Sequence, residues 1–114
     1  MVGHIAVPAL DESGAPASLS VPIVQGLLRQ GLGFKGLVIS DDLEMGALSS
    51  LGAGEIAVRA LEAGCDLLLF CHTQSKVSEA LRAVENAHRE GRLAERNLAA
   101  SLQRIATFKA RFGA

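Results

Sequence analysis

The feature that most constrains this chain is the segment 33–45, which reads GFKGLVISDDLEM. A glycine turn leads into the apolar run 37–39, and the carboxylates Asp41 and Asp42 follow after one serine. A short apolar run after a turn predicts a buried strand over 37–39. The carboxyl end of a parallel strand is where α/β proteins usually hold their chemistry. The segment therefore predicts a site beside the Asp pair.

Strand and helix patterns alternate along the rest of the chain. Residues 1–7 and 67–70 predict strands, and the second is apolar on both faces, as in a parallel sheet covered by helices. Apolar residues at helical spacing predict helices over 21–30, 54–63 and 75–90. The order β-α-β-α-β-α-α describes one α/β unit with right-handed crossovers. A final helix carries an apolar stripe made of Leu98, Leu102, Ile105, Phe108 and Phe112.

Composition excludes several classes of partner. The 114 residues are 49% hydrophobic and contain no apolar run long enough for a membrane span. A net charge of −1 and an aromatic content of 4% give no basis for binding nucleic acid or an acidic membrane surface. The first ten residues lack the basic and apolar regions of a signal peptide. We expect a cytoplasmic protein.

The two cysteines, Cys65 and Cys71, flank one predicted strand. An extended chain separates them by about 20 Å, which is too far for a disulfide. We therefore expect two buried free thiols. The chain shows no CxxC pair or Cys/His spacing of a zinc site, and we expect no metal and no cofactor.

Asp41 and Asp42 cannot both face one substrate, because successive residues of an extended strand point to opposite sides. One carboxylate should enter the pocket, while its neighbour turns toward the helices or caps the following turn. An alternative remains open at this point, in which both residues only cap the loop, a position that Asp favours.

The chain resembles glycoside hydrolase family 3, and most closely the bacterial β-N-acetylhexosaminidases of peptidoglycan recycling. The segments that carry the resemblance are 3–11 (GHIAVPALD), 16–20 (PASLS), 33–45 and 60–69 (ALEAGCDLLL). The resemblance implies that Asp41 is the catalytic nucleophile of a retaining glycosidase, with a carbohydrate, an N-acetylglucosaminide, as substrate. It also implies an α/β fold in which residues 1–114 are a single partial domain, the last three β/α units of a TIM-type (β/α)₈ barrel plus a closing helix.

The general acid/base of this family subgroup is a His supported by an Asp, on a loop with a Lys-His-Phe-Pro-Gly-His-Gly-Asp-like motif. This chain contains no such motif. We expect His4 to line the pocket or pack there, His72 to be a solvated loop residue, and His88 to face solvent. The resemblance gives His4 and Met45 as candidates for contacting the sugar. General acid assistance contributes roughly 10²–10⁴-fold to a rate, so we expect the chain alone to be nearly inactive.

Alternatives to this function remain at the level of the sequence. β-Glucosidase-type members of the family share the nucleophile segment more loosely. A phosphoacceptor receiver domain has a similar length, but the run that ends at Phe70 is followed by no Asp to accept phosphate. A non-catalytic fragment is a third alternative. Met1 lies where full-length relatives have an internal strand residue, so we expect a truncated or excised piece whose open strand edges allow self-association.

Overall fold

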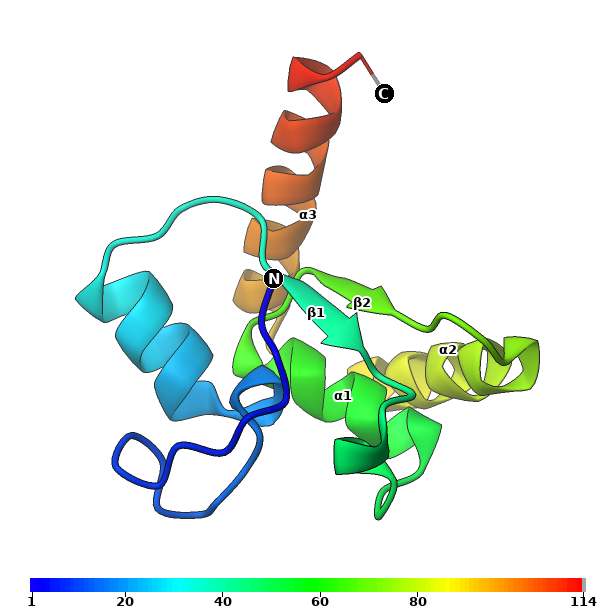
Figure 1. Cartoon of the computed structure of the whole chain (residues 1–114). Helices are drawn as coiled ribbons and strands as arrows, with labels where there is room; N and C mark the ends of the chain where they lie inside the picture. The colour runs from blue at the N-terminus through cyan, green and yellow to red at the C-terminus, as the bar shows by residue number, and fades with distance from the viewer. Residues whose placement is uncertain (114) are drawn as a thin grey trace.

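The computed structural model describes residues 1–113, which form a mixed α/β unit around a small parallel sheet. Its strands are β1 (Ile39–Asp42) and β2 (Leu67–Leu69), which lie side by side in Figure 1. Ile39 pairs with Leu67 and Asp42 with Leu69, with an irregularity between them. The helices are α1 (Ala53–Ala63), α2 (Gln74–Arg89) and α3 (Glu95–Arg111).

The core lies between the sheet, the N-terminal turns and α1, which runs beneath β1 in Figure 1. Leu43 and Val38 from the β1 region meet Ile56 of α1 there. A second cluster joins α1 to α2 and to the connection before α3, through Val58, Ala87 and Leu93. The helices α1 and α2 approach so closely at Gly54 that an added Cβ would lie 2.7 Å from the Ala83 Cβ. These contacts fix α1 and α2 as the support of the sheet.

The first predicted strand, over 1–7, is not present. Only Val2 joins the sheet, through a parallel bridge to Ser40 in which the Val2 N–H donates to the Ile39 carbonyl oxygen at 2.8 Å. The segment then turns toward the loop before η1 (Ala17–Leu19), because the Ile5 carbonyl oxygen accepts a hydrogen bond from the Ala17 N–H. The chain therefore enters the sheet for one residue and leaves it.

The predicted helix over 21–30 is the π-helix η2, Pro22–Gly31. Ser20 caps its start, since the Ser20 hydroxyl oxygen accepts a hydrogen bond from the Ile23 N–H at 3.2 Å. A π-helix takes up more residues per turn than an α-helix, so residues at α-helical spacing drift off one face. Val24 is buried, whereas Val21 and Leu32, predicted on the same face, are exposed.

The other predicted elements are found with small shifts. The strand predicted over 37–39 begins at Ile39 and includes both Asp residues; the Val38 N–H just before it donates to the Asp66 carboxylate. The helices predicted over 54–63 and 75–90 are confirmed within one residue. β2 ends at Leu69, one residue earlier than predicted.

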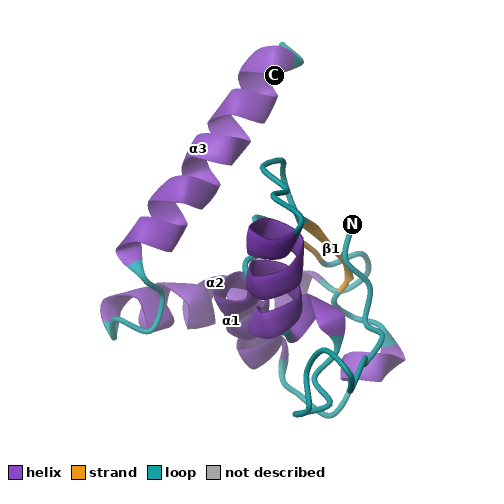
Figure 2. Cartoon of the chain, turned by 90° about the vertical axis from the view of Figure 1, so that its left-hand side faces the viewer, coloured by secondary structure: helices purple, strands orange, loops and turns teal. Residues whose placement is uncertain are grey.

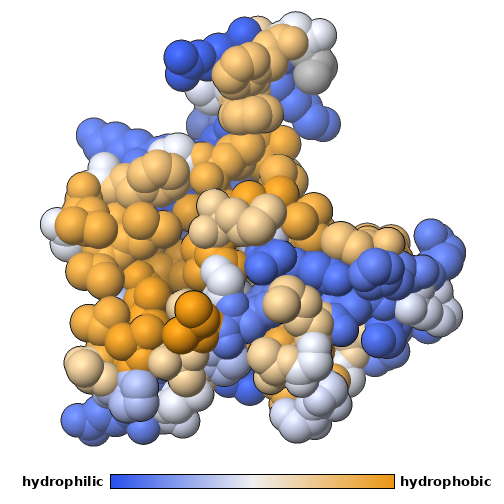
Figure 3. Space-filling view, in the orientation of Figure 1, coloured by the Kyte–Doolittle hydropathy of each residue, from blue (hydrophilic) through white to orange (hydrophobic). Residues whose placement is uncertain are grey.

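The final helix α3 is present, but its apolar stripe is not buried. Figures 1 and 2 both show α3 projecting away from the rest of the chain. Leu102 and Phe112 are 65% and 63% exposed, and no α3 residue is buried. In Figure 3, apolar side chains also gather over the N-terminal segment and η2, while the surface over α2 is hydrophilic.

Candidate active site

Asp41 and Asp42 lie at the carboxyl end of β1, and their carboxylates are held differently. Both residues are partly buried. The Asp41 Oδ1 atom accepts a hydrogen bond from the Asp42 N–H at 2.7 Å. Within residues 1–113, the other Asp41 carboxylate oxygen takes part in no hydrogen bond or ion pair. One oxygen of Asp41 is therefore oriented by the backbone and the other is available to a ligand.

Asp42 ties the end of β1 to the end of β2. Its Oδ1 atom accepts hydrogen bonds from the Glu44 N–H at 3.0 Å and from the Cys71 N–H at 3.3 Å. Its Oδ2 atom lies 3.3 Å from His72 Nε2. These are the contacts of a turn cap, so Asp42 has the capping role that the sequence predicts for one member of the pair.

Glu44 strengthens the same connection, and no pattern in the sequence singles it out. Its side chain is 4% exposed, and its Oε2 atom accepts hydrogen bonds from the N–H groups of His72, at 2.6 Å, and Thr73, at 3.1 Å. Lys76 Nζ lies 3.6 Å from Glu44 Oε1. The hydrogen bonds from Thr73 and His72, together with Lys76, lower the Glu44 pKa to about 2. Glu44 is therefore a fixed anion that aligns the two loops.

His4 lies across the end of β1 rather than in a strand of its own. Its Nε2 atom is 2.8 Å from the Asp42 carbonyl oxygen, and its Nδ1 atom is 2.6 Å from the Ser18 hydroxyl oxygen. Ser18 is fully buried. Both ring nitrogens of His4 are therefore engaged by the protein, while its role in contacting a sugar stays a prediction.

The other predicted residues are on the rim or outside the site. Met45 is 44% exposed and lines a hollow of about 290 Å³ beside Glu44. His72 is 74% exposed, as predicted for a solvated loop residue. His88 pairs with Glu95 at 3.6 Å on the surface, which confirms that it faces solvent.

The cysteines are both free, but only Cys65 is buried. Burial, together with the neighbouring Asp66 carboxylate, raises the Cys65 pKa to about 12. Cys71 is exposed, contrary to the prediction, because β2 ends at Leu69 and leaves Cys71 in the loop before α2.

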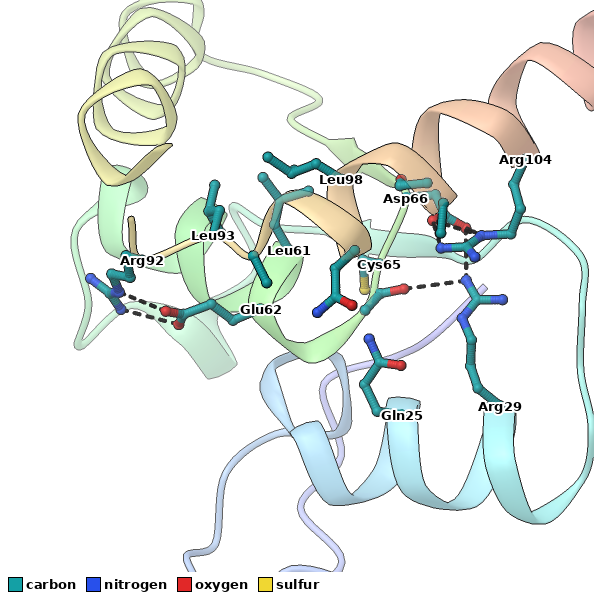
Figure 4. Close-up of a pocket in the computed structure, with 15 residues that line it drawn as sticks. Gln25, Arg29, Leu61, Glu62, Cys65, Asp66, Arg92, Leu93, Leu98 and Arg104 are labelled. Atoms are coloured by element: carbon teal, nitrogen blue, oxygen red, sulfur yellow. Dashed lines mark hydrogen bonds and ion pairs between the residues drawn. The ribbon is translucent and has the colours of Figure 1, made fainter. Parts of the chain in front are cut away.

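A cavity of about 260 Å³ lies away from the Asp pair, between η2, α1 and α3. Figure 4 shows Asp66 there with Arg29 and Arg104 directed at its carboxylate. The distances to the Asp66 oxygens are 2.8 Å from Arg29 Nη2 and 2.7 Å from Arg104 Nη2. Asp66 Oδ2 also accepts a hydrogen bond from the Val38 N–H at 2.9 Å. One buried carboxylate thus binds both guanidinium groups and a backbone N–H, which is the arrangement of a structural anchor.

No group of three or more His, Cys, Asp and Glu side chains within residues 1–113 is placed to hold a metal ion. The helices of the described part of the chain are also too short or too polar to cross a membrane.

Comparison with known proteins shows the family of the chain. The family described as "Glycosyl hydrolase family 3 N terminal domain" matches residues 1–108. The chain therefore belongs to this family.

Two curated relatives are β-hexosaminidases. One, from Stenotrophomonas maltophilia (strain K279a), is 43% identical over 86 residues, which cover 75% of this chain and 25% of the relative. The other, β-hexosaminidase LpqI of Mycobacterium tuberculosis (strain H37Rv), is 43% identical over 116 residues, covering 96% of this chain and 29% of the relative. The chain thus spans about a quarter of the length of these relatives.

A solved structure shares the arrangement of the whole unit. A fungal multi-domain family 3 β-N-acetylglucosaminidase superposes with a TM-score of 0.94 at 36% identity. The match covers 98% of this chain and 13% of the fungal chain.

Proposed function

We propose that this chain supplies the catalytic nucleophile, Asp41, of a retaining exo-β-N-acetylglucosaminidase that acts in peptidoglycan recycling. The observation that carries the proposal is the Asp41 carboxylate at the carboxyl end of β1, with one oxygen held by the Asp42 N–H. The names of the β-hexosaminidase relatives support the substrate class. An N-acetylglucosaminide would be the carbohydrate partner.

In the proposed reaction the Asp41 carboxylate attacks the anomeric carbon and the leaving group departs with a proton from a general acid. The resulting glycosyl ester is then hydrolysed by water, which returns the sugar with its original anomeric configuration. The backbone hydrogen bond to Asp41 Oδ1 leaves its other oxygen as the attacking atom.

We further propose that the unit is the last three β/α units of a (β/α)₈ barrel with a closing helix. The superposition on a family 3 enzyme supports this, as does the parallel bridge that places Val2 beside β1, on the residue Ser40. The general acid/base would then come from a different strand. The 114-residue chain alone should hydrolyse an unactivated glycoside very slowly, since general acid catalysis is worth roughly 10²–10⁴-fold.

The test expresses the chain alone and fused behind the preceding strands of a β-hexosaminidase relative, with a chromogenic β-N-acetylglucosaminide as substrate. We expect turnover only from the fusion, and its loss in Asp41→Asn. Glu12→Gln, which removes an exposed carboxylate, is the matched control and should keep full turnover. Turnover that survives Asp41→Asn would contradict the assignment. Faster release from a β-glucoside than from the N-acetylglucosaminide would favour the β-glucosidase-type alternative.

Three further expectations belong to the same proposal. Cell fractionation should find the protein in the cytoplasm. With a net charge of −1 it should bind neither nucleic acid nor acidic vesicles. The exposed apolar side chains on α3 and around the N-terminal segment (Figure 3), together with the open edges of the sheet, should cause self-association in sedimentation experiments.

A further inference from the structure

His4 connects two segments that are distant in sequence, at the point where β1 ends. The Asp42 carbonyl oxygen can only accept a hydrogen bond, so His4 Nε2, 2.8 Å away, must carry a proton. In the neutral ring Nδ1 is then an acceptor, and the Ser18 hydroxyl, at 2.6 Å, donates to it. The pair of contacts selects one tautomer and one ring orientation.

Ser18 is itself fixed on several sides. It is fully buried. Its N–H donates to the Gly3 carbonyl oxygen at 3.1 Å, and its carbonyl oxygen accepts a hydrogen bond from the Cys65 thiol at 3.6 Å. The hydroxyl that holds His4 therefore has little freedom to move, and the imidazole connects a rigid loop to the strand end.

The strand end that His4 holds is the one that orients Asp41. The carbonyl group bound by His4 Nε2 and the N–H group bound by the Asp41 carboxylate both belong to Asp42. They lie on the two sides of a single Cα atom. When the carbonyl direction is fixed, the backbone of Asp42 is restricted, and so is the direction of the N–H that holds Asp41 Oδ1 at 2.7 Å.

We propose that His4 is a positioning residue for Asp41. Its Nε2–H, in the tautomer set by Ser18, keeps the Asp42 backbone in the conformation that aims the Asp41 carboxylate. The proposal rests on the proposed function of Asp41. It differs from a sugar-contacting role for His4, because both ring nitrogens are already used within the protein.

The experiment uses the whole 114-residue chain and a 5-fluoro-N-acetylglucosaminyl fluoride. The Asp41 carboxylate attacks the anomeric carbon, the C–F bond breaks, fluoride leaves, and a glycosyl ester of Asp41 remains. Fluoride departs without a general acid, so the reaction does not need the missing acid/base. Mass spectrometry gives the rate of ester formation at each probe concentration, and Asp41→Asn should give none.

Two variants of similar size separate the roles of the two ring nitrogens. His4→Gln retains a side-chain N–H donor near the position of Nε2, whereas His4→Asn retains a polar group only near Nδ1. We expect His4→Asn to lower the maximal labelling rate by about 10- to 100-fold, the range that follows from misplacing a reacting group by up to an ångström. His4→Gln should recover most of the rate. The half-saturating probe concentration should be unchanged in both variants.

A second readout does not depend on the reaction. Loss of the His4 contact should speed hydrogen exchange at the Asp42 amide in His4→Asn, and much less so in His4→Gln. In Ser18→Ala the imidazole ¹⁵N shifts should show a mixture of tautomers in place of Nε2–H alone. Circular dichroism confirms that each variant is folded.

The outcomes distinguish the two levels of the proposal. If the unsubstituted chain is not labelled, the role of Asp41 is wrong, while the amide exchange still tests His4. If His4→Asn is labelled at the normal maximal rate, or its Asp42 amide exchanges normally, His4 does not position Asp41. A rise in the half-saturating concentration with an unchanged maximal rate would make His4 a sugar-binding residue instead.

Discussion

Two aspartates of the same small sheet differ in how completely the protein satisfies them. Asp66, just before β2, has a side chain with no exposed surface, and it receives hydrogen bonds from Arg29, Arg104 and the Val38 N–H. Asp41 lies near the carboxyl end of β1, at the other end of the sheet from Asp66. It is partly buried, and its carboxylate accepts one hydrogen bond, from the Asp42 N–H. The first carboxylate has its hydrogen-bonding capacity filled, and the second retains capacity for another molecule.

The difference indicates which end of the sheet stabilises the fold and which can carry chemistry. In barrel and doubly wound proteins, the amino ends of strands usually serve stability and the carboxyl ends hold the site. The Asp66 carboxylate pairs with Arg29 of η2 and Arg104 of α3, and so attaches two outlying helices to the sheet. The Asp41 carboxylate, by contrast, holds only the backbone N–H of the next residue.

The largest expected effect is on activity, from Asp41→Asn. In the fusion that contains the preceding strands, we expect no detectable turnover of the chromogenic substrate, because an amide cannot form the glycosyl ester. The free energy of unfolding should change by no more than about 1 kcal/mol, because the asparagine oxygen can still accept the hydrogen bond from the Asp42 N–H. If Asp41→Asn destabilised the fold as much as Asp66→Asn, the contrast between the two aspartates would be wrong.

The next effect is on stability, from Asp66→Asn. The substitution leaves the guanidinium groups of Arg29 and Arg104 without their partner in a buried setting, which costs about 3–5 kcal/mol. Urea unfolding followed by circular dichroism measures the loss. Arg104→Ala should lower the free energy of unfolding less than Arg29→Ala, because the Arg104 side chain is 23% exposed and that of Arg29 is 11% exposed. Equal losses in the Asp66 and Asp41 variants would contradict the comparison.

A third effect is on the pH dependence of stability, and it concerns Glu44. Its pKa falls from 4.5 to about 2 on folding, because hydrogen bonds from Thr73 and His72 favour the carboxylate. A lowered pKa gives stability that is present above pH 4.5 and is lost as the pH falls toward 2.

Glu44→Gln should therefore flatten the acid limb of the stability curve between those values. The measurement is the urea midpoint at several pH values. Asp66 also has a lowered pKa, because the hydrogen bonds from Arg104 and Val38 outweigh the effect of burial. Some acid sensitivity should for this reason remain in the variant. A curve identical to that of the unsubstituted chain would show that Glu44 is not held as described.

The smallest effect is expected at the connection between α2 and α3. Arg92 bridges two carboxylates of α1, with Nη2 2.9 Å from Glu55 Oε1 and Nε 2.7 Å from Glu62 Oε1. All three side chains are partly exposed. Arg92→Ala should therefore cost no more than about 1 kcal/mol in urea unfolding. A loss as large as that for Asp66→Asn would show that this surface network, rather than the buried one, anchors α3.

Several elements could be predicted because local signals are strong there. The helices over 54–63 and 75–90 have regular apolar spacing and glycines at or near their ends, and they form within one residue of the prediction. The site end of β1 was also predictable, since an apolar run followed by two carboxylates is a local pattern. That one carboxylate would cap the turn follows from the alternation of a strand.

The rest depends on contacts between distant residues. Val2 joins β1 for a single bridge because N–H groups of η1 bind the carbonyl oxygens that follow it, at Gly3 and Ile5. The π-helical winding of η2 changes which residues face the core, and apolar spacing does not reveal it. The contact of His4 with Ser18, 14 residues away, and with Asp42, 38 residues away, is equally invisible in sequence.

The unequal cysteines make the chain convenient to observe. Cys65 is buried, with a pKa near 12, so alkylating reagents in mild alkali should leave it intact. Cys71 is exposed and open to reagents, although partial desolvation and the nearby Asp42 carboxylate raise its pKa; its N–H donates to the carboxylate of Asp42. A fluorophore attached to Cys71 would therefore test whether a sugar binds beside Asp42, without any engineered attachment point.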